Sequence, residues 1–447
     1  MLAMTELTLN PLDVPSMSMT TAQMIDQLPS SNHPGALKAF YEAAIMNDLP
    51  VALWRYPNDK SYHAIVDLSG QVATHRIDLS HLPAGFVFSP FVNQDEEGML
   101  FIKADIYFSA DGFQIDDENG SHFTNETIQA NRHLFLDTYH ARMAGYDPTT
   151  PKWCVPTTND DLALDEYSFC GLVDSAIDYL KSSDLEKIVV SRIAEEPLPD
   201  DFHPIETIMR LGERYSHAFV SLVSIPNVGT WIGASPERLL TMEKGGFTTV
   251  ALAGTQAKPA NLPLDWVTWG EKEIREQALV SDYIRAFFQR VGISWQEDGP
   301  CTVAAGNVVH LQTAFRAQVD LEEQVKVVNQ VFEHLHPTSA VCGMPKEQAL
   351  DFILDHEMYD RSFYSGFLGP VRLHGLCQLF VNLRCMQLSQ NKACLYVGAG
   401  ITAESVPQAE WQETVLKSQT LLSVLNSTNQ STTPSVNSAN SLMAMVK

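Results

Sequence analysis

Paired carboxylates occur twice in this 447-residue chain at the spacing that places side chains on one face of a helix. Glu410, Glu413 and Lys417 form the first set, and Glu273 with Glu276 forms the second. Residues three or four positions apart share a helix face, so each set presents its charges together. Four carboxylates from two segments could supply the oxygen ligands that Mg²⁺ prefers. Either pair alone is also typical of a solvated helix face.

Two predicted helices must position these charges. The stretch from Glu271 to Val291 repeats apolar residues at helical intervals and is followed by Gly292, a common helix terminator. A second helix is predicted from about residue 409 to 425. Its predicted apolar set consists of Trp411, Leu416, Leu421, Leu422 and Val424. Upstream, a strand-like run over 393–397 precedes the glycines of 398–401, which predict a turn with accessible backbone beside the carboxylates.

Composition restricts the partners. The formal charge is −25, with 29 Lys and Arg against 54 Asp and Glu, which argues against nucleic-acid and anionic-membrane binding. An anionic ligand would need a bound metal ion and locally placed basic residues to overcome that charge. No apolar run approaches the length of a membrane span.

Cysteine usage and the amino-terminal sequence indicate the compartment. The seven cysteines show no C-x-x-C spacing, so a disulfide framework or zinc ribbon is not expected. The first basic residue is Lys38, so the start of the chain lacks the charge pattern of a secretory signal or transit peptide. We therefore expect a soluble cytoplasmic protein with reduced thiols.

The chain reads as one large α+β domain. Residues 1–35 and 426–447 are polar or irregular and are predicted to be flexible ends. Between them, over 36–425, strand-like and helix-like runs alternate without an internal repeat or a linker. Turn signals such as Pro226-Asn227 predict hairpins and therefore mainly antiparallel sheets, flanked by helices.

Several common catalytic motifs are absent from the sequence. There is no G-x-x-x-x-G-K-[ST], no G-x-S-x-G, and no H-E-x-x-H, because Asp360 follows His356-Glu357-Met358-Tyr359. Gly398-Ala399-Gly400 is followed by Ala403 where a dinucleotide fingerprint needs glycine, and no βαβ unit surrounds it. Nucleotide hydrolysis, zinc hydrolysis and nicotinamide chemistry are thus disfavoured.

Seven segments in sequence order carry a family resemblance. They lie at 187–192 (KIVVSR), 233–240 (GASPERLL), 251–255 (ALAGT), 335–345 (LHPTSAVCGMP), 360–366 (DRSFYSG), 382–385 (NLRC) and 398–417. Together they resemble the chorismate-utilising enzymes from about residue 185 to 425. The resemblance implies that family's single α+β domain, chorismate as substrate and Mg²⁺ as cofactor.

Three residues, Lys187, Ala253 and Ala340, separate the reactions within that family, and a fourth, Glu237, takes part in the reaction. By resemblance, Lys187 stands where water-using relatives carry a lysine that deprotonates water, and Glu237 is the general acid. Ala253 replaces the lysine by which aminodeoxychorismate-forming relatives attack the ring. Ala340 stands where salicylate-forming relatives typically have threonine. Without the family, Lys187 fits a solvent-facing lysine equally well, and an exposed turn glutamate is the favoured interpretation of Glu237.

The resemblance also implies the rest of a substrate pocket. Four positions present backbone N–H groups or a hydroxyl to carboxylate oxygens: Gly254, Thr255, Gly398 and Gly400. Three side chains bind the enolpyruvyl carboxylate: Tyr364, Arg384 and Lys417. His310 resembles the histidine that contacts the ring, although a satisfied core histidine is the alternative.

The acidic pairs take a metal-binding role by the same resemblance. Glu276 and Glu413 would hold Mg²⁺ directly, and Glu273 and Glu410 would hold its waters. Gln277 departs from the family, in which histidine commonly follows the metal glutamate.

The resemblance therefore implies an isochorismate synthase that adds water at C2 of chorismate while the C4 hydroxyl leaves. A salicylate synthase is the alternative, and a catalytically silent chorismate-binding or metal-binding protein is a third reading. No glutaminase subunit is expected, and a monomer is the family-like expectation.

Overall fold

The computed structural model describes residues 35–75, 79, 82–92, 98–115, 126–145, 151–157, 163–243, 245–259, 263–305, 308–319, 327, 329–332 and 334–425. The flexible ends predicted from the sequence fall outside these ranges, except for Gly35. No helix in these ranges is long and apolar enough to cross a lipid bilayer.

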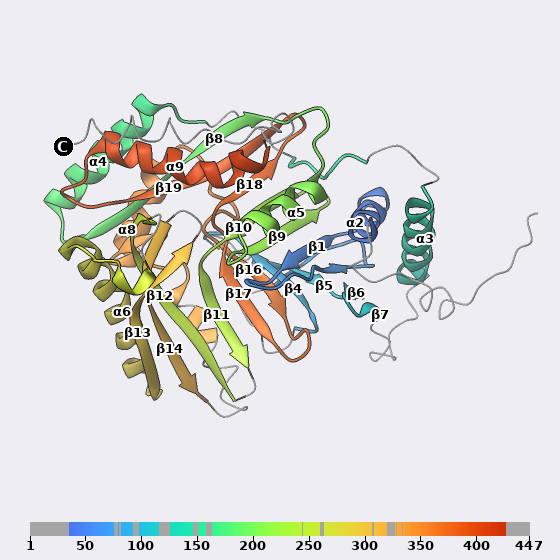
Figure 1. Ribbon diagram of the computed structural model, residues 1–447, viewed down its shortest axis with the longest axis horizontal. Coiled ribbons are helices and arrows are strands. Elements are labelled where there is room, and N and C mark those ends of the chain that lie inside the picture. The colour runs from blue at the N-terminus through green and yellow to red at the C-terminus, as the bar shows by residue number, and fades with distance from the viewer. Residues whose placement is uncertain are drawn as a thin grey trace, which may run out of the picture.

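Two large sheets form the framework of the described residues (Figure 1). The first sheet has the order β15 (Gly343–Met344), β8 (Lys187–Pro197), β19 (Lys392–Ile401), β18 (Cys385–Leu388), β10 (Gly229–Ser235), β9 (Phe219–Ile225), β1 (Val51–Arg55), β2 (His63–Val66), β6 (Ile106–Ser109) and β7 (Gly112–Ile115). The second has the order β13 (Trp295–Ala305), β14 (Val308–Gln318), β12 (Gly246–Ala257), β11 (Arg238–Glu243), β17 (Cys377–Val381), β16 (Phe367–Val371), β4 (Gly85–Ser89), β5 (Met99–Lys103) and β3 (Ala73–His75).

Neighbouring strands in both sheets pair antiparallel, which confirms the predicted α+β class. The predicted turn near Asn227 joins β9 to β10, with Asn227 at a φ of 64° and a Val228 N–H to Ile225 C=O bond of 3.1 Å. Asparagine tolerates this left-handed backbone better than most residues, which explains why it stands there.

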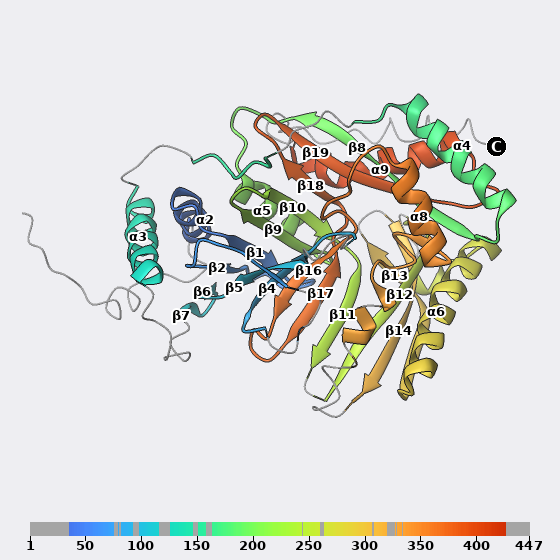
Figure 2. The same ribbon diagram turned by 180° about the vertical axis from the view of Figure 1, so that it is seen from behind.

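Helices cover both sheets (Figures 1 and 2). The helices α4 (Glu166–Ser182), α8 (Lys346–His356) and α9 (Pro407–Leu425) pack against β8, β15 or β19. The helix α6 (Glu271–Val291) lies on β12 and β14, and the short η1 (Leu264–Trp266) contacts β13. At the other end of the first sheet lie α2 (Ala36–Met46), α3 (Glu126–Met143) and α5 (Pro204–Arg214).

An aromatic core joins the two sheets. Phe219 of β9 stacks on Phe380 of β17, with ring centroids 4.0 Å apart. Trp54, Phe88 and Trp231 belong to the same buried cluster. Rings of this size bury a large apolar area, so they hold the sheets face to face.

The glycines before α9 correct one prediction. Gly398 and Gly400 do not form a turn but continue β19, which pairs with β8 as far as Ile401. A Cβ atom on Gly398 would lie 2.9 Å from the Tyr364 hydroxyl, and one on Gly400 would lie 2.8 Å from Lys187 Cε. The glycines are needed because side chains approach the strand closely, not because the chain turns.

The two predicted helices are present, and one differs from its prediction. The helix α6 has the predicted bounds, with Gly292 as its left-handed C-cap at a φ of 73°. The helix α9 begins at Pro407, two residues before the predicted start, and its predicted apolar set is partly wrong because Leu416 is 55% exposed. The buried side includes Thr414, which accepts a 2.8 Å bond from Arg192 Nε. A polar anchor thus replaces part of the expected apolar contact.

A buried ion pair ties distant segments together. Arg361 Nη2 lies 2.6 Å from Glu357 Oε1, and both side chains are at most 2% exposed. Arg361 also donates to the C=O of Val189 in β8 (2.7 Å) and of Val341 (2.9 Å). The N–H and hydroxyl of Ser191 donate to Glu357. This clamp fixes β8 against the segment 338–342.

Candidate active site

Lys187 lies at the start of β8, beside β15 and β19. Its backbone pairs with Met344, and its side chain passes over Gly400, where only the absence of a Cβ atom leaves room. The side chain is half-buried, so it is not the solvent-facing lysine of the alternative reading. Its charge acts on the carboxylates of Glu237 and Glu413. The strand therefore directs an amine toward two acidic groups from other elements.

Glu237 occupies the short link between β10 and β11 and is only 8% exposed. Its N–H donates to Ser235 Oγ at 3.3 Å, and its C=O accepts from the Val381 N–H at 3.0 Å. The Thr338 hydroxyl donates to Glu237 Oε1 at 3.3 Å. Both ends of the residue are thus fixed, and the exposed turn glutamate is excluded.

Burial raises the pKa of Glu237 to about 7, against the lowering effects of the Thr338 hydrogen bond and of the cations Lys187, Arg384 and Lys417. Burial prevails because the carboxylate form loses its hydration, whereas the neutral acid loses little. A carboxyl group with this pKa can hold a proton near neutral pH and release it, as a general acid must.

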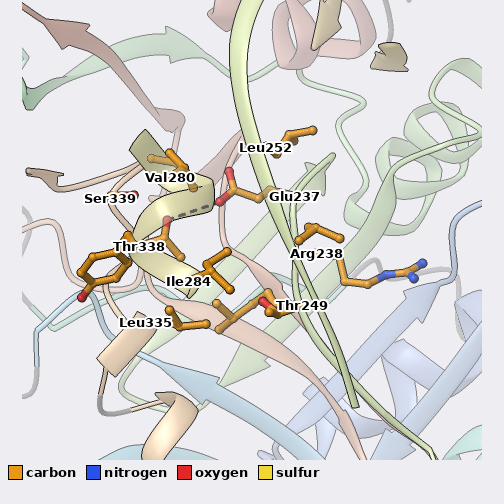
Figure 3. A pocket seen from close by; sticks show the side chains of 13 residues that line it. Glu237, Arg238, Thr249, Leu252, Val280, Ile284, Leu335, Thr338 and Ser339 are labelled. Carbon is orange, nitrogen blue, oxygen red and sulfur yellow. Dashed lines mark hydrogen bonds between the residues drawn. The ribbon is translucent and has the colours of Figure 1, made fainter. Parts of the chain in front are cut away.

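Glu237 lies in the wall of a partly open pocket, which together with the solvent space at its mouth measures about 370 Å³ (Figure 3). Glu237 and Thr338 face each other at its wall, joined by their hydrogen bond. Its apolar lining comes from α6, β11, β12 and the segment before Thr338, and includes Leu239, Leu252, Val280, Ile284 and Leu335. Ala340 also lines it, so the predicted discriminator lies in the same cavity as the acid.

Glu413 and Lys417 form an ion pair one helical turn apart on α9. Lys417 Nζ lies 2.6 Å from Glu413 Oε1 and donates to the Gly398 C=O at 2.7 Å. Burial acts to raise the pKa of Glu413, but Lys417 and the nearby Arg384 outweigh it, so the pKa is lowered. Burial lowers the pKa of Lys417 in spite of its partner. Glu413 is accordingly ionised at neutral pH.

Arg384 and Tyr364 lie beside this pair. Arg384 adopts a left-handed backbone with a φ of 49°, and its C=O accepts from the Ala234 N–H at 3.1 Å. Burial lowers the pKa of its guanidinium, which interacts with Tyr364, Glu413 and Glu237. Burial raises the pKa of Tyr364 to about 12, so its hydroxyl keeps its proton. Two donors are thereby available to an anion.

His310 of β14 faces a β-bulge in β12. The bulge lies between Ala253 and Thr255, with Gly254 at a φ of 70°. His310 Nδ1 lies 3.0 Å from Thr255 Oγ1 and 3.3 Å from the Gly254 C=O. Burial and Arg384 lower the pKa of His310 to about 4, so the ring is neutral. Its buried Nε2 has no hydrogen-bond partner among the described residues, so the fully satisfied core histidine is excluded.

The four predicted metal-binding glutamates lie on the first turns of α6 and α9. In the described ranges, no three His, Cys, Asp or Glu side chains lie close enough together to hold a metal ion. Burial raises the pKa of Glu410, which interacts with Glu413 on its own helix and with Lys272 of α6. Glu273 and Glu276 are half-buried on the same helix as Lys272. The protein side chains alone therefore do not form the predicted four-carboxylate metal site.

The chemical type of the four side chains nevertheless suits Mg²⁺, which prefers oxygen ligands. All four groups offer carboxylate oxygens, and Glu413 is held ionised. Such an ion completes its shell with water and substrate oxygens, so it needs few protein ligands. The charge of Lys272 acts on Glu410, so the starts of the two helices lie within electrostatic range of each other.

Sequence reasoning missed several residues of the site. Thr338 lies inside the HPTSA segment that carried the resemblance, but its bond to Glu237 spans 101 positions. Gln277 was noted only as a departure, yet it is buried and hydrogen-bonded to β12 and β14. Arg361 lay in the DRSFYSG segment without an assigned role. Each acts through a partner far away in sequence.

Known proteins resemble this chain in both sequence and fold. Residues 69–426 match the family model described as chorismate binding enzyme. The chain belongs to this family. The chain is 32% identical over 253 residues to the salicylate biosynthesis isochorismate synthase of Pseudomonas aeruginosa, over 55% of the chain and 52% of that protein. It is 28% identical over 257 residues to the vibriobactin-specific isochorismate synthase of Vibrio cholerae, over 56% of the chain and 64% of the relative.

The match to isochorismate synthase EntC of Escherichia coli is 27% over 266 residues, 58% of the chain and 67% of that protein. The chain thus spans between about half and two thirds of these relatives' lengths. Two solved structures share the fold. The menaquinone-specific isochorismate synthase MenF of Escherichia coli aligns with a TM-score of 0.68 at 21% identity, over 87% of the chain and 91% of that structure. Anthranilate synthase component I of Streptococcus pneumoniae aligns with a TM-score of 0.57 at 20% identity, over 83% and 90%.

Glu237→Gln tests the burial of the acid through stability. Because the folded-state pKa of Glu237 is raised, the stability from its protonation is present at low pH and is lost as pH rises through about 7. The side chain of the variant cannot ionise. The free energy of unfolding of the variant minus that of wild type should therefore be larger at pH 8 than at pH 5, by on the order of 2 kcal/mol.

Urea unfolding at both pH values measures this gain. The exposed Glu186→Gln serves as the control and should show no such dependence. An equal difference between Glu237→Gln and wild type at both pH values would contradict the raised pKa.

Proposed function

We propose that this protein is a Mg²⁺-dependent isochorismate synthase that converts chorismate to isochorismate. The observation that carries the proposal is that Glu237, a buried carboxyl group with a pKa of about 7, lies within electrostatic range of the amine of Lys187. Three relatives whose names include isochorismate synthase support the same reaction.

Glu237 supplies the acid half of the reaction. It donates its proton to the C4 hydroxyl of the ring, which leaves as water when the C4–O bond breaks. A hydroxide is a poor leaving group, so protonation at this step lowers the barrier. The apolar cavity wall keeps the acid protonated before reaction, and Thr338 orients it.

Lys187 supplies the base half. Lys187 must first release its own proton to solvent, and as a neutral amine it then accepts a proton from the water molecule whose oxygen bonds to C2, while the ring double bonds shift toward C4. One water enters and one leaves, so the net change is an isomerisation. Lys187 then returns its proton through solvent to Glu237. Because water is the nucleophile, the proposal includes no glutaminase subunit.

A group of cations and donors explains how a chain of charge −25 can hold a dianionic substrate. Arg384, Lys417 and Tyr364 are the groups proposed to bind the enolpyruvyl carboxylate. These three groups lie near one another. Lys417 donates to the Gly398 C=O, the Tyr364 hydroxyl lies beside Gly398, and the charge of Arg384 interacts with Tyr364 and Glu413. Thr255 and the backbone at Gly254 face His310 on the far side and are proposed to contact the ring and its carboxylate.

The proposed metal site uses Glu276 and Glu413 as direct ligands, with Glu273 and Glu410 holding water molecules. When bound, Mg²⁺ would supply positive charge to the ring carboxylate, which the acidic helices cannot do. Glu413 would then divide its two oxygens between Lys417 and the metal site.

Ala340 favours isochorismate over salicylate as the product. Its methyl group lines the cavity beside Glu237 and has no hydroxyl to direct a second elimination step. The relative from Pseudomonas aeruginosa is itself named an isochorismate synthase, so a salicylate pathway does not require salicylate release by this class of protein.

Product identification with a Lys187 variant tests the reaction. Purified protein with chorismate and Mg²⁺ should yield isochorismate, and Lys187→Ala should lower kcat by at least about 100-fold because the general base is lost. Chorismate binding, measured by calorimetry, should change far less. The exposed Lys181→Ala is the matched control and should retain wild-type turnover.

Three outcomes contradict the proposal. Salicylate and pyruvate as main products would favour the salicylate synthase, and tight chorismate binding without turnover would favour a silent binding protein. Wild-type kcat in Lys187→Ala would remove that residue from the mechanism.

Glu413→Gln tests the metal ligand. The amide keeps the shape of the side chain but removes its charge, so the Mg²⁺ concentration for half-maximal activity should rise at least about tenfold. A Mg²⁺ titration of the initial rate measures the change. Glu347→Gln, exposed on α8, should leave the titration unaltered. An unchanged midpoint in Glu413→Gln would refute its assignment as a ligand.

A further inference from the structure

Gln277 is a buried amide one residue beyond Glu276 on α6, and only 3% of its surface is exposed. Its Oε1 accepts from the Ala253 N–H at 3.0 Å. Its Nε2 donates to the Ala251 C=O at 3.2 Å and to Thr313 Oγ1 at 3.0 Å. The side chain therefore uses its acceptor and its two N–H donors within the protein interior.

Gln277 forms these bonds at a part of β12 that pairs with a neighbouring strand on only one side. Among the described residues, β11 pairs with β12 only through Gly246, Phe247 and Thr248, whereas β14 accompanies β12 to its end. The C=O of Ala251 and the N–H of Ala253 point to the same side of the strand, because alternate residues do so. A side-chain amide offers a donor and an acceptor as a peptide group does, so Gln277 substitutes for missing backbone partners.

The anchored stretch leads directly into the bulge of the proposed substrate site. Ala253 precedes Gly254, and a Cβ atom on Gly254 would lie 3.0 Å from both Cβ and the C=O of Glu273. The start of α6 thus packs directly against the bulge, with little room for a side chain at position 254. Thr255 follows and contacts His310. One amide therefore lies between the proposed metal-binding helix turn and the proposed ring-binding bulge.

We propose that Gln277 is a positioning residue that sets how closely the first turns of α6, with Glu273 and Glu276, approach the Gly254 bulge. The inference rests on the proposed function for its catalytic consequence, but the anchoring itself does not. Gln277 acts through the backbone of β12 and through its neighbours on α6, and touches neither substrate nor metal in this role.

Only an amide meets all of these demands. Glutamate keeps the acceptor for Ala253 but loses both donors and buries a charge against the Ala251 C=O. Methionine has a similar length and no strong donor or acceptor, so both backbone groups would be left unpaired. A histidine ring has one donor and one acceptor that diverge, so it cannot meet Ala251 and Ala253 as the amide does.

Amide hydrogen exchange and Mg²⁺ binding test the inference on the full chain. In wild type, the Ala253 amide should be as well protected as the strand amides of β14. In Gln277→Met, its exchange should be at least about tenfold faster, because one buried hydrogen bond is lost. Gln277→Glu keeps that acceptor and should leave the Ala253 amide protected.

Both variants should raise, by about fivefold or more, the Mg²⁺ concentration needed for half-saturation in calorimetric titrations with chorismate present. The value of kcat at saturating Mg²⁺ should stay within about threefold of wild type, since no reacting group changes. Gln289→Met, exposed on the same helix, is the matched control and should alter none of these values.

Rapid exchange of Ala253 in wild type would overturn the inference without any variant. So would a Gln277→Met protein in which Ala253 exchange and the Mg²⁺ midpoint both stay within twofold of wild type. If wild type binds Mg²⁺ and chorismate but forms no isochorismate, the proposed function fails while exchange and calorimetry still decide the role of Gln277.

Discussion

The arrangement of the candidate site depends on the buried Arg361–Glu357 pair. Arg361 bonds to backbone C=O groups on both sides, in β8 and in the segment 338–342, while Glu357 accepts from Ser191. A guanidinium with several fixed donors suits this task, because a buried charge must be fully paired. One joined segment carries Lys187 and the other carries Thr338, which holds Glu237. The clamp therefore fixes the base and the acid relative to each other.

The candidate site, which extends beyond the cavity at Glu237, brings opposite charges close together, and their partial burial strengthens the interactions between them. Burial raises the pKa of Glu237, while the neighbouring cations keep Glu413 ionised. Two carboxyl groups in one site thus titrate in different ranges, as acid catalysis and metal binding respectively require. His310 stays neutral beside them, because burial and the Arg384 charge disfavour its protonation. The candidate site therefore combines cationic groups with a carboxyl group that can hold a proton near neutral pH.

Local patterns predicted the parts of this protein that depend on local chemistry. The bounds of α6 followed from apolar periodicity and Gly292, and the hairpin followed from Asn227. The glycines of β19 wrongly predict a turn, because the side chains of Lys187 and Tyr364 that lie close to them come from elsewhere in the chain. The local pattern wrongly predicts that Leu416 is buried, because it does not reveal that Thr414 faces the interior and accepts a hydrogen bond from Arg192.

The candidate residues came from motif resemblance, whereas their supports required the structure. Thr338, Gln277 and Arg361 each act through hydrogen bonds to distant segments, which a single sequence does not reveal.

A reaction in H₂¹⁸O tests most directly whether water adds to C2 as the C4 hydroxyl leaves. We predict isochorismate with one ¹⁸O atom, located in the C2 hydroxyl, by mass spectrometry and NMR. Unlabelled isochorismate, or label at another position, would contradict the account.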